Sequence, residues 1–165
     1  MSATIQLGVQ TFFSPDDNTQ QVFLDFLGQA QQNIYIAIYG WHLPPAVAIL
    51  LAKQHAGIPV ALVMDHLQAT GRYEAPEVIQ LVQGGCDVTI GTSQKHKILH
   101  HKFAVVDQTH VLAGSWNFSE SSSLENNYLQ IVSNAEMAAL FLAKWHEMHD
   151  WIRAHEPQYQ PKAGS

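Results

Sequence analysis

Short apolar segments recur along the whole chain, each bounded by polar or turn-forming residues. In some of them the apolar residues alternate as in a strand, and in others they recur every three or four positions as in a helix. The expected strands are residues 5–13, 33–39, 60–64, 87–90, 102–106, 111–113 and 128–132, and the expected helices are 22–30, 46–55, 75–82 and 135–152. Because strands and helices alternate and several strands are apolar throughout, the pattern predicts an α/β sandwich with helices on both faces of a sheet.

The composition fits one folded domain. Of the 165 residues, 47% are hydrophobic and only 13% are charged, and a chain with this balance is not disordered. No repeat, linker or low-complexity tract interrupts the pattern. We therefore expect a single domain over residues 1–157 and a frayed tail over residues 158–165.

The cysteine content and the hydropathy bear on the compartment. Cys86 is the only cysteine, so no internal disulfide can form and a reducing environment is expected. Residues 1–8 contain no basic residue and no long apolar stretch, unlike a secretory signal. No apolar run approaches the roughly 20 residues of a membrane span. The expectation is a cytoplasmic protein without stable membrane insertion.

The charges are unevenly distributed. The net charge is -6 with histidines neutral, which argues mildly against a wide nucleic-acid footprint. Residues 95–102, however, contain three lysines and three histidines and no acidic residue. This concentration of basic groups indicates a local anion site, although a solvated basic loop is the simpler alternative.

The spacing of polar groups around one expected hairpin is compatible with phosphate chemistry. His100 and Lys102 are two apart and would project from one face of a strand. Residues 107–109 have the length and polarity of a hairpin turn, so the next strand returns beside the first. Ser115 and Asn117, again two apart, would then face the same point. An imidazole can attack phosphorus or move a proton, and an ammonium, a hydroxyl and an amide can bind phosphate oxygens.

A family resemblance rests on these residues. The strings HHKFAVVD at 100–107 and GSWNFS at 114–119 resemble the His-x-Lys-x4-Asp and Gly-Ser-x-Asn-x-Ser signature of the phospholipase D superfamily. One copy is present, so the chain is similar to the single-motif bacterial nucleases and the mitochondrial cardiolipin hydrolase group. Residues 13–15, 63–65 and 125–126 also resemble family segments. The resemblance implies a catalytic domain with a mixed sheet sandwiched between helices.

The resemblance assigns the main catalytic roles. His100 would form a phosphohistidine in one subunit and act as general acid in the other. Lys102 and Asn117 would bind the phosphate, and Ser115 would support the histidine or the phosphate. Because one motif supplies one histidine, a C2 homodimer is expected to share the site. These groups require neither a metal nor a cofactor.

Two acidic residues have supporting roles by the same resemblance. Asp107 corresponds to the motif aspartate, and we expect it to fix the turn by accepting from backbone donors. Glu125 corresponds to the acid that orients the histidine ring. The sequence departs from the family here, because Ser123 stands where an Asn is usual.

Other residues have competing interpretations. Zinc binding by His96 and His100, four apart, is disfavoured because no Glu follows His96 and the segment leads into a strand. His101 is expected to face away from His100. The candidate substrate-binding residues, some of which could equally serve in packing, are Lys97, Lys95, Arg72, Trp41 and His42. The sequence predicts an endonuclease acting on DNA or RNA; the alternatives are a phospholipase acting on a lipid such as cardiolipin and a silent nucleic-acid-binding module.

Overall fold

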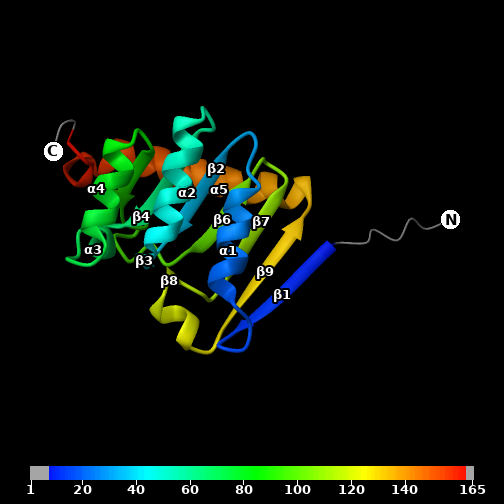
Figure 1. Cartoon of the computed structure of the whole chain (residues 1–165). Helices are drawn as coiled ribbons and strands as arrows, with labels where there is room; N and C mark the ends of the chain where they lie inside the picture. The colour runs from blue at the N-terminus through cyan, green and yellow to red at the C-terminus, as the bar shows by residue number, and fades with distance from the viewer. Residues whose placement is uncertain (1–7, 163–165) are drawn as a thin grey trace.

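The computed structural model describes residues 8–162 as a mixed sheet with helices on both faces (Figure 1). The sheet has seven strands in the order β1-β9-β7-β6-β2-β4-β5, and β3 and β8 form a separate two-stranded sheet. The strands are β1 (Gly8–Ser14), β2 (Ile34–Ile38), β3 (Trp41–His42), β4 (Val60–Asp65), β5 (Asp87–Gly91), β6 (Lys102–Val106), β7 (His110–Gly114), β8 (Phe118–Ser119) and β9 (Asn127–Ser133). The helices are α1 (Thr19–Gly28), α2 (Pro44–His55), α3 (His66–Ala69), α4 (Ala75–Gln83) and α5 (Ala135–His155), with short 3₁₀ turns at Ser121–Leu124 and Pro157–Tyr159.

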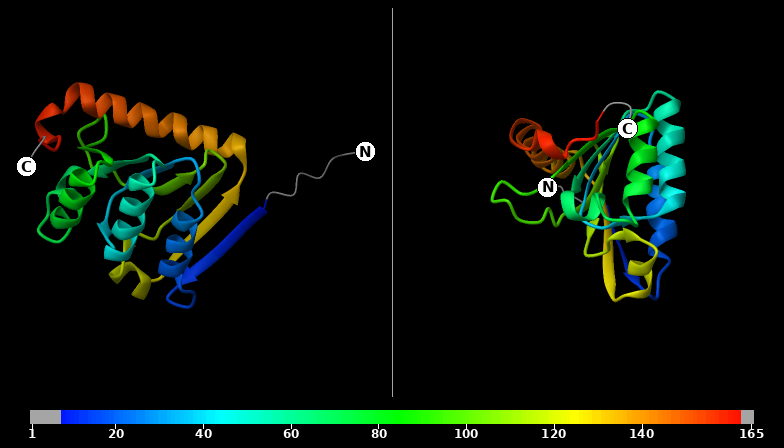
Figure 2. Two further views of the ribbon diagram at one scale, coloured as in Figure 1. Left: turned by 45° about the horizontal axis from the view of Figure 1, so that its top comes forward. Right: turned by 90° about the vertical axis from the view of Figure 1, so that its left-hand side faces the viewer.

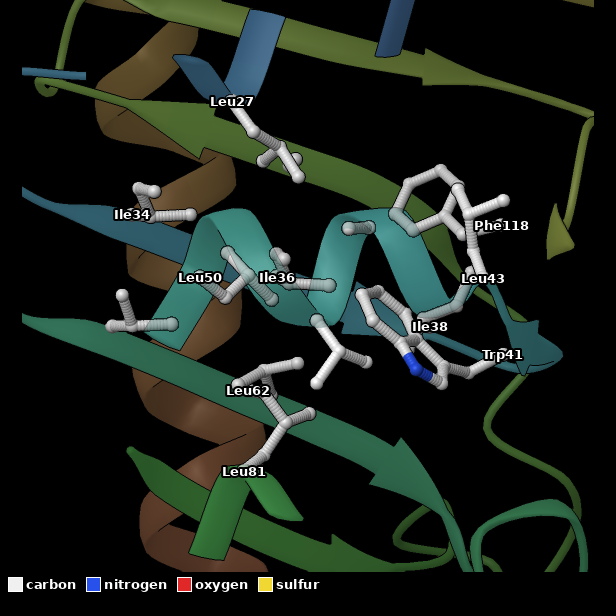
Figure 3. Packing of buried hydrophobic residues seen from close by; sticks show 14 of the residues in the cluster. Leu27, Ile34, Ile36, Ile38, Trp41, Leu43, Leu50, Leu62, Leu81 and Phe118 are labelled. Carbon is white, nitrogen blue, oxygen red and sulfur yellow. The ribbon is translucent and has the colours of Figure 1, made fainter. Parts of the chain in front are cut away.

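Two apolar layers hold the helices on the sheet. Helices α1, α2 and α4 cover one face, and α5 crosses the other face (Figure 2). On the first face, strand residues such as Ile36 and Leu62 pack against Leu27, Leu50 and Leu81 (Figure 3). On the second face, Trp145 of α5 is buried and donates from Nε1 to the carbonyl of Ile36 over 2.8 Å. The predicted α/β sandwich is confirmed.

The topology brings several strand ends to one edge of the sheet. Strands β2 and β4 are parallel, whereas β6 is antiparallel to both β2 and β7. The ends of β2, β4 and β7 therefore lie at the same edge as the beginning of β6. Phe103 pairs with Ala113, so the residues just before β6 lie beside those just after β7. These are the segments that hold the motif.

The motif hairpin has the turn that its length predicts. Asp107 and Gln108 both have positive φ, at 54° and 55°. The N–H of Thr109 donates to the carbonyl of Val106 over 3.2 Å, and Val106 pairs with His110, so the turn occupies residues 107–109 as predicted. The turn lies at the opposite edge of the sheet from the motif histidine.

Several elements differ from the sequence prediction. The first strand begins at Gly8, and residues 5–7 of the prediction lie outside the described residues. The segment expected to be a loop after β2 contains the short strand β3, and α3 follows β4 directly. The prediction of a frayed tail from residue 158 onward is corrected by one contact. The side chain of Gln160 donates to the carbonyl of Ile90 over 2.8 Å and accepts from the N–H of Ile90. The tail is thereby docked on β5 as far as the structure describes it.

Within residues 8–162, no helix combines the length and the apolar composition that a bilayer crossing requires.

Candidate active site

His100 and Lys102 lie together at the edge where the strand ends meet. Nζ of Lys102 is 3.3 Å from Nε2 of His100, and it donates to the carbonyl of His100 over 3.0 Å. An ammonium group can only donate, so a hydrogen bond between these two atoms requires Nε2 to be the acceptor. The lone pair that could attack phosphorus is thereby held next to a positive charge.

Tyr39, which follows β2, completes this contact. Its ring lies edge-to-face with the His100 ring at 4.8 Å between centroids, and the Lys102 ammonium is 5.4 Å from its centroid. Gln68 donates to the tyrosine hydroxyl over 3.1 Å. Tyr39 was not predicted as a site residue, because it is sixty-one positions before His100 in the sequence.

Lys102 is a buried cation. Its residue is only 8% exposed, and within residues 8–162 no carboxylate pairs with it. Burial lowers the pKa of its ammonium below the ordinary value of 10.5. A buried charge of this kind is costly unless a counterion binds. An anion such as a phosphate diester is the partner that would satisfy it.

Asp65 fixes the loop that presents His100. This residue ends β4 and is 1% exposed. Its Oδ2 accepts from the backbone N–H of Leu99 over 2.8 Å, and its Oδ1 accepts from the first turn of α3 at Leu67 and Gln68. One carboxylate therefore joins the residue immediately before His100 to the end of a core strand.

Ser115 and Glu125 are joined through Asn127, which the motif does not include. Ser115 Oγ donates to Asn127 Oδ1 over 2.9 Å and accepts from the N–H of Tyr128 over 3.1 Å. Asn127 Nδ2 donates to Glu125 Oε2 over 3.2 Å. In this chain Glu125 therefore contacts Asn127, and its role as the acid that orients His100 stays a prediction. Ser123, at the position that departs from the family, accepts from Trp116 Nε1 over 3.3 Å.

Asn117 is placed against the end of β2. Its Oδ1 accepts from the N–H of Gly40 over 3.1 Å. A Cβ on Gly40 would lie 3.0 Å from the Asn117 amide, so the glycine permits this close approach. The carbonyl side of the amide is held by the backbone, which leaves the amide Nδ2 as the group that could donate to a ligand.

Asp107 accepts hydrogen bonds from backbone N–H groups, as predicted, but these groups belong to another segment and not to its own turn. Its carboxylate oxygens accept from the N–H groups of Gln31, Gln32 and Asn33 at 2.7–3.2 Å. It thus joins the β6–β7 turn to the loop that enters β2. Its place in the turn, away from His100, makes it a structural residue.

The predicted substrate-binding residues differ in exposure. Lys95 and Lys97 lie exposed on the loop before His100. Arg72 is exposed and donates to the hydroxyl of Tyr73. Trp41 is fully buried and packs with Phe118. Its burial therefore indicates a packing role, which was the alternative to substrate binding. His42 is half-exposed; its Nδ1 lies 2.6 Å from a carboxylate oxygen of Glu77.

His101 differs from its neighbour in its packing. Its ring contacts Phe103 edge-to-face at 5.5 Å, on the α5 side of the sheet, while His100 contacts Tyr39. Burial, together with Lys144, Lys102 and His100, lowers the pKa of His101. The two adjacent histidines therefore contact different aromatic rings, Tyr39 and Phe103, although both line one cavity with Lys95 and Lys144. Within residues 8–162, no three histidine, cysteine or acidic residues are grouped as metal ligands.

Comparison with known proteins bears on this geometry. A family model described as a cardiolipin synthase, PLD-like domain matches residues 23–149, which include both motif strings. The chain belongs to the phospholipase D-like family. The phospholipase D family member Nuc from Salmonella typhimurium has the same fold, with a TM-score of 0.80 and 23% identity over 87% of this chain and 94% of that one. NucT from Helicobacter pylori matches with a TM-score of 0.78 and 17% identity over 87% and 96% of the two chains.

Curated relatives extend the phospholipase D-like match. A protein named phospholipase D from Rickettsia bellii is 24% identical over 83% of this chain and 67% of its own length. The mitochondrial cardiolipin hydrolase of Chlamydomonas reinhardtii is 25% identical over 79% of this chain and 57% of its own length. The chain thus spans roughly half to two thirds of these relatives. The phospholipase D-like resemblance drawn from the motif is confirmed.

Proposed function

We propose that this protein is a metal-independent phosphodiesterase, an endonuclease that cleaves DNA or RNA through a phosphohistidine. The observation that carries the proposal is the Lys102 ammonium, which is buried without a carboxylate and lies 3.3 Å from His100 Nε2. A phosphodiester would supply the missing negative charge and place its phosphorus beside the nucleophilic nitrogen. Lys102 and Asn117 then provide fixed donors for the charge that develops on the non-bridging oxygens.

The reaction proceeds in two displacements. Nε2 of neutral His100 forms a bond to phosphorus while the bond to the leaving oxygen breaks, and a second His100, as a cation, gives that oxygen a proton. The second histidine, now neutral, takes a proton from water. The resulting hydroxide forms a bond to phosphorus, the phosphorus–nitrogen bond breaks, and His100 is restored.

A homodimer is part of this proposal. The chain has one His-x-Lys-x4-Asp motif, and the mechanism needs two histidines at one phosphate. A C2 dimer that brings the two motif edges together supplies both with one type of contact.

Nucleic acid is the substrate that the charges around His100 favour. Lys95 and Lys97 precede His100 on an exposed loop, where they could contact phosphates on either side of the scissile one. A phospholipid such as cardiolipin is the second candidate, favoured by the names of the curated relatives. The chemistry at phosphorus is the same for both substrates.

A substrate panel tests the proposal. The protein is incubated with labelled single-stranded DNA, duplex DNA, RNA and cardiolipin vesicles, each with and without EDTA. We expect cleavage of nucleic acid that EDTA leaves unchanged and that His100→Ala lowers by several orders of magnitude. His101→Ala, the adjacent matched control, should retain activity. Hydrolysis of cardiolipin alone, or activity that EDTA abolishes and a divalent metal restores, would contradict the proposal.

A further inference from the structure

A cavity of about 450 Å³ lies beside the residues proposed to bind the phosphate. It includes Tyr39 and Asn117 of the candidate active site, and it extends away from them toward the segment between α3 and α4. Its lining within the described residues includes no lysine or arginine, and its carboxylates are those of Glu74 and Glu125. The lining of this cavity therefore favours a neutral group that donates hydrogen bonds.

Glu74 is the residue that points to a ligand. It is 7% exposed, and its Oε1 accepts from the N–H of Trp41 over 2.9 Å. Its Oε2 is buried and has no hydrogen-bond partner among residues 8–162. A buried acceptor without a donor costs free energy, which a ligand that donates to it would recover.

The titration of Glu74 supports the same interpretation. Burial raises the pKa of this carboxyl to about 7. The hydrogen bond from the Trp41 N–H opposes this rise, and the carboxylates of Glu77 and Asp65 add to it. At neutral pH the carboxyl is therefore poised between its charged and neutral forms. A donor group placed at Oε2 would favour the charged form.

Aromatic rings lie at the mouth of the cavity. Tyr73 is 62% exposed, its ring centroid is 6.4 Å from that of the half-exposed His42, and the Arg72 guanidinium lies over its ring at 4.5 Å. Tyr73 and His42 both line the cavity. Exposed rings of this kind provide a surface on which a nucleobase can stack.

A second cavity, which His100 itself lines, has basic residues in its lining. This cavity of about 230 Å³ is lined by His100 and His101 together with Lys95 and Lys144. Tyr39, whose ring contacts His100, belongs to the first cavity. A diester bound at His100 would therefore border a cavity with basic residues in its lining as well as the acidic and aromatic cavity beside Glu74.

We infer that the cavity beside Glu74 binds the nucleobase next to the scissile phosphate, and that Glu74 Oε2 accepts a hydrogen bond from its amino group. This inference rests on the proposed nuclease function and adds a base preference to it. Adenine, cytosine and guanine each have an amino group, whereas thymine has a single N–H between two carbonyls. The protein should therefore cleave beside an amino-bearing base faster than between thymines.

The test uses end-labelled oligothymidylates that contain one central adenine, cytosine or guanine. We expect the wild type to cleave beside the inserted base roughly 10- to 100-fold faster than between thymines, the factor expected of one hydrogen bond to a charged acceptor. Glu74→Gln should abolish or reverse this ratio, because its amide would present a donor in place of the free acceptor. Glu120→Gln is the matched control: Glu120 is exposed and near the cavity but outside its lining, so the ratio should stay that of the wild type.

The outcomes separate the base site from the nuclease function. Equal cleavage at every position by the wild type, or an unchanged ratio in a folded Glu74→Gln variant, would overturn the base site and leave the nuclease proposal intact. Hydrolysis of phosphatidylethanolamine vesicles with no cleavage of any oligonucleotide would overturn both. If circular dichroism shows that Glu74→Gln is unfolded, Tyr73→Leu is tested in its place. Loss of the base preference in Tyr73→Leu would support the base site. An unchanged preference would overturn it.

Discussion

The Lys102 ammonium lies 3.3 Å from Nε2 of His100 and has no carboxylate partner within residues 8–162. This relationship joins stability to function, because a cation that is poorly compensated in the unliganded fold is what an anionic substrate would bind. Proteins commonly accept such a cost in stability at functional sites.

Replacing Lys102 should therefore lower the activity without lowering the stability. Lys102→Met replaces a buried charged side chain by an uncharged one of similar length. We expect the free energy of unfolding to stay unchanged or rise by up to roughly 1 kcal/mol. The phosphodiesterase rate should fall by about 10²- to 10³-fold or more, because a donor to the transition state is lost. Urea unfolding and steady-state kinetics on one preparation give both values. A variant that loses stability but keeps its rate would show that Lys102 is structural.

Glu125→Gln tests whether Glu125 acts on the histidine. The glutamine carbonyl can still accept from Asn127 Nδ2, so the contact with Asn127 and Ser115 is preserved. If the carboxylate also sets the tautomer of His100, turnover should fall by roughly 10²-fold while substrate binding stays nearly unchanged. Comparison of kcat and KM with the wild type measures this. An unchanged kcat would limit Glu125 to supporting Asn127.

The buried carboxyl of Glu74 predicts a pH dependence of stability. Burial raises its pKa to about 7 from an ordinary value of 4.5, so between these values the folded state holds a proton that the unfolded state has lost. The free energy of unfolding should fall as pH rises through this window, by at most about 3 kcal/mol.

Glu74→Gln provides the comparison, because it cannot titrate. Urea unfolding of the wild type and the variant at pH 5 and pH 8 should show that the variant gains stability relative to the wild type at the higher pH. The same difference between the two proteins at both pH values would contradict the burial of an ionisable group at this position.

Subunit mixing tests the shared site. Wild-type and His100→Ala chains are mixed in equal amounts, denatured and refolded together, so that about one quarter of the dimers are wild type on both sides. If each site needs a His100 from both subunits, activity per total protein should be roughly a quarter of that of the pure wild type. Sites complete within one chain would leave about half. Wild type refolded alone is the control for recovery.

The motif hairpin could be predicted from the sequence because its interactions are local. His100 and Lys102 are two apart, and the turn at Asp107 returns the chain to Ser115 and Asn117 within a few residues. Alternation along a strand and the length of a turn are sufficient for that placement. The same reasoning predicted the strands and long helices that surround the hairpin.

The contacts that support the motif could not be predicted, because they depend on sheet order. Tyr39 and Asp65 reach His100 and Leu99 only because β2 and β4 end at the edge where β6 begins. The N–H groups that bind Asp107 come from a loop more than seventy positions earlier. Trp41 gave no local signal that it is a core residue, since a loop tryptophan after a strand is equally compatible with ligand contact.

The most direct test of the account is to trap the intermediate and locate it. A single-turnover reaction with an oligonucleotide that has a sulfur leaving atom at the scissile bond is quenched in alkali, where a phosphorus–nitrogen bond to histidine survives. Peptide mass mapping then identifies the modified residue. The account predicts an adduct on His100 that forms and decays at the rate of turnover, and no adduct in His100→Ala. Full turnover with no adduct on His100, or an adduct on His101 instead, would contradict it.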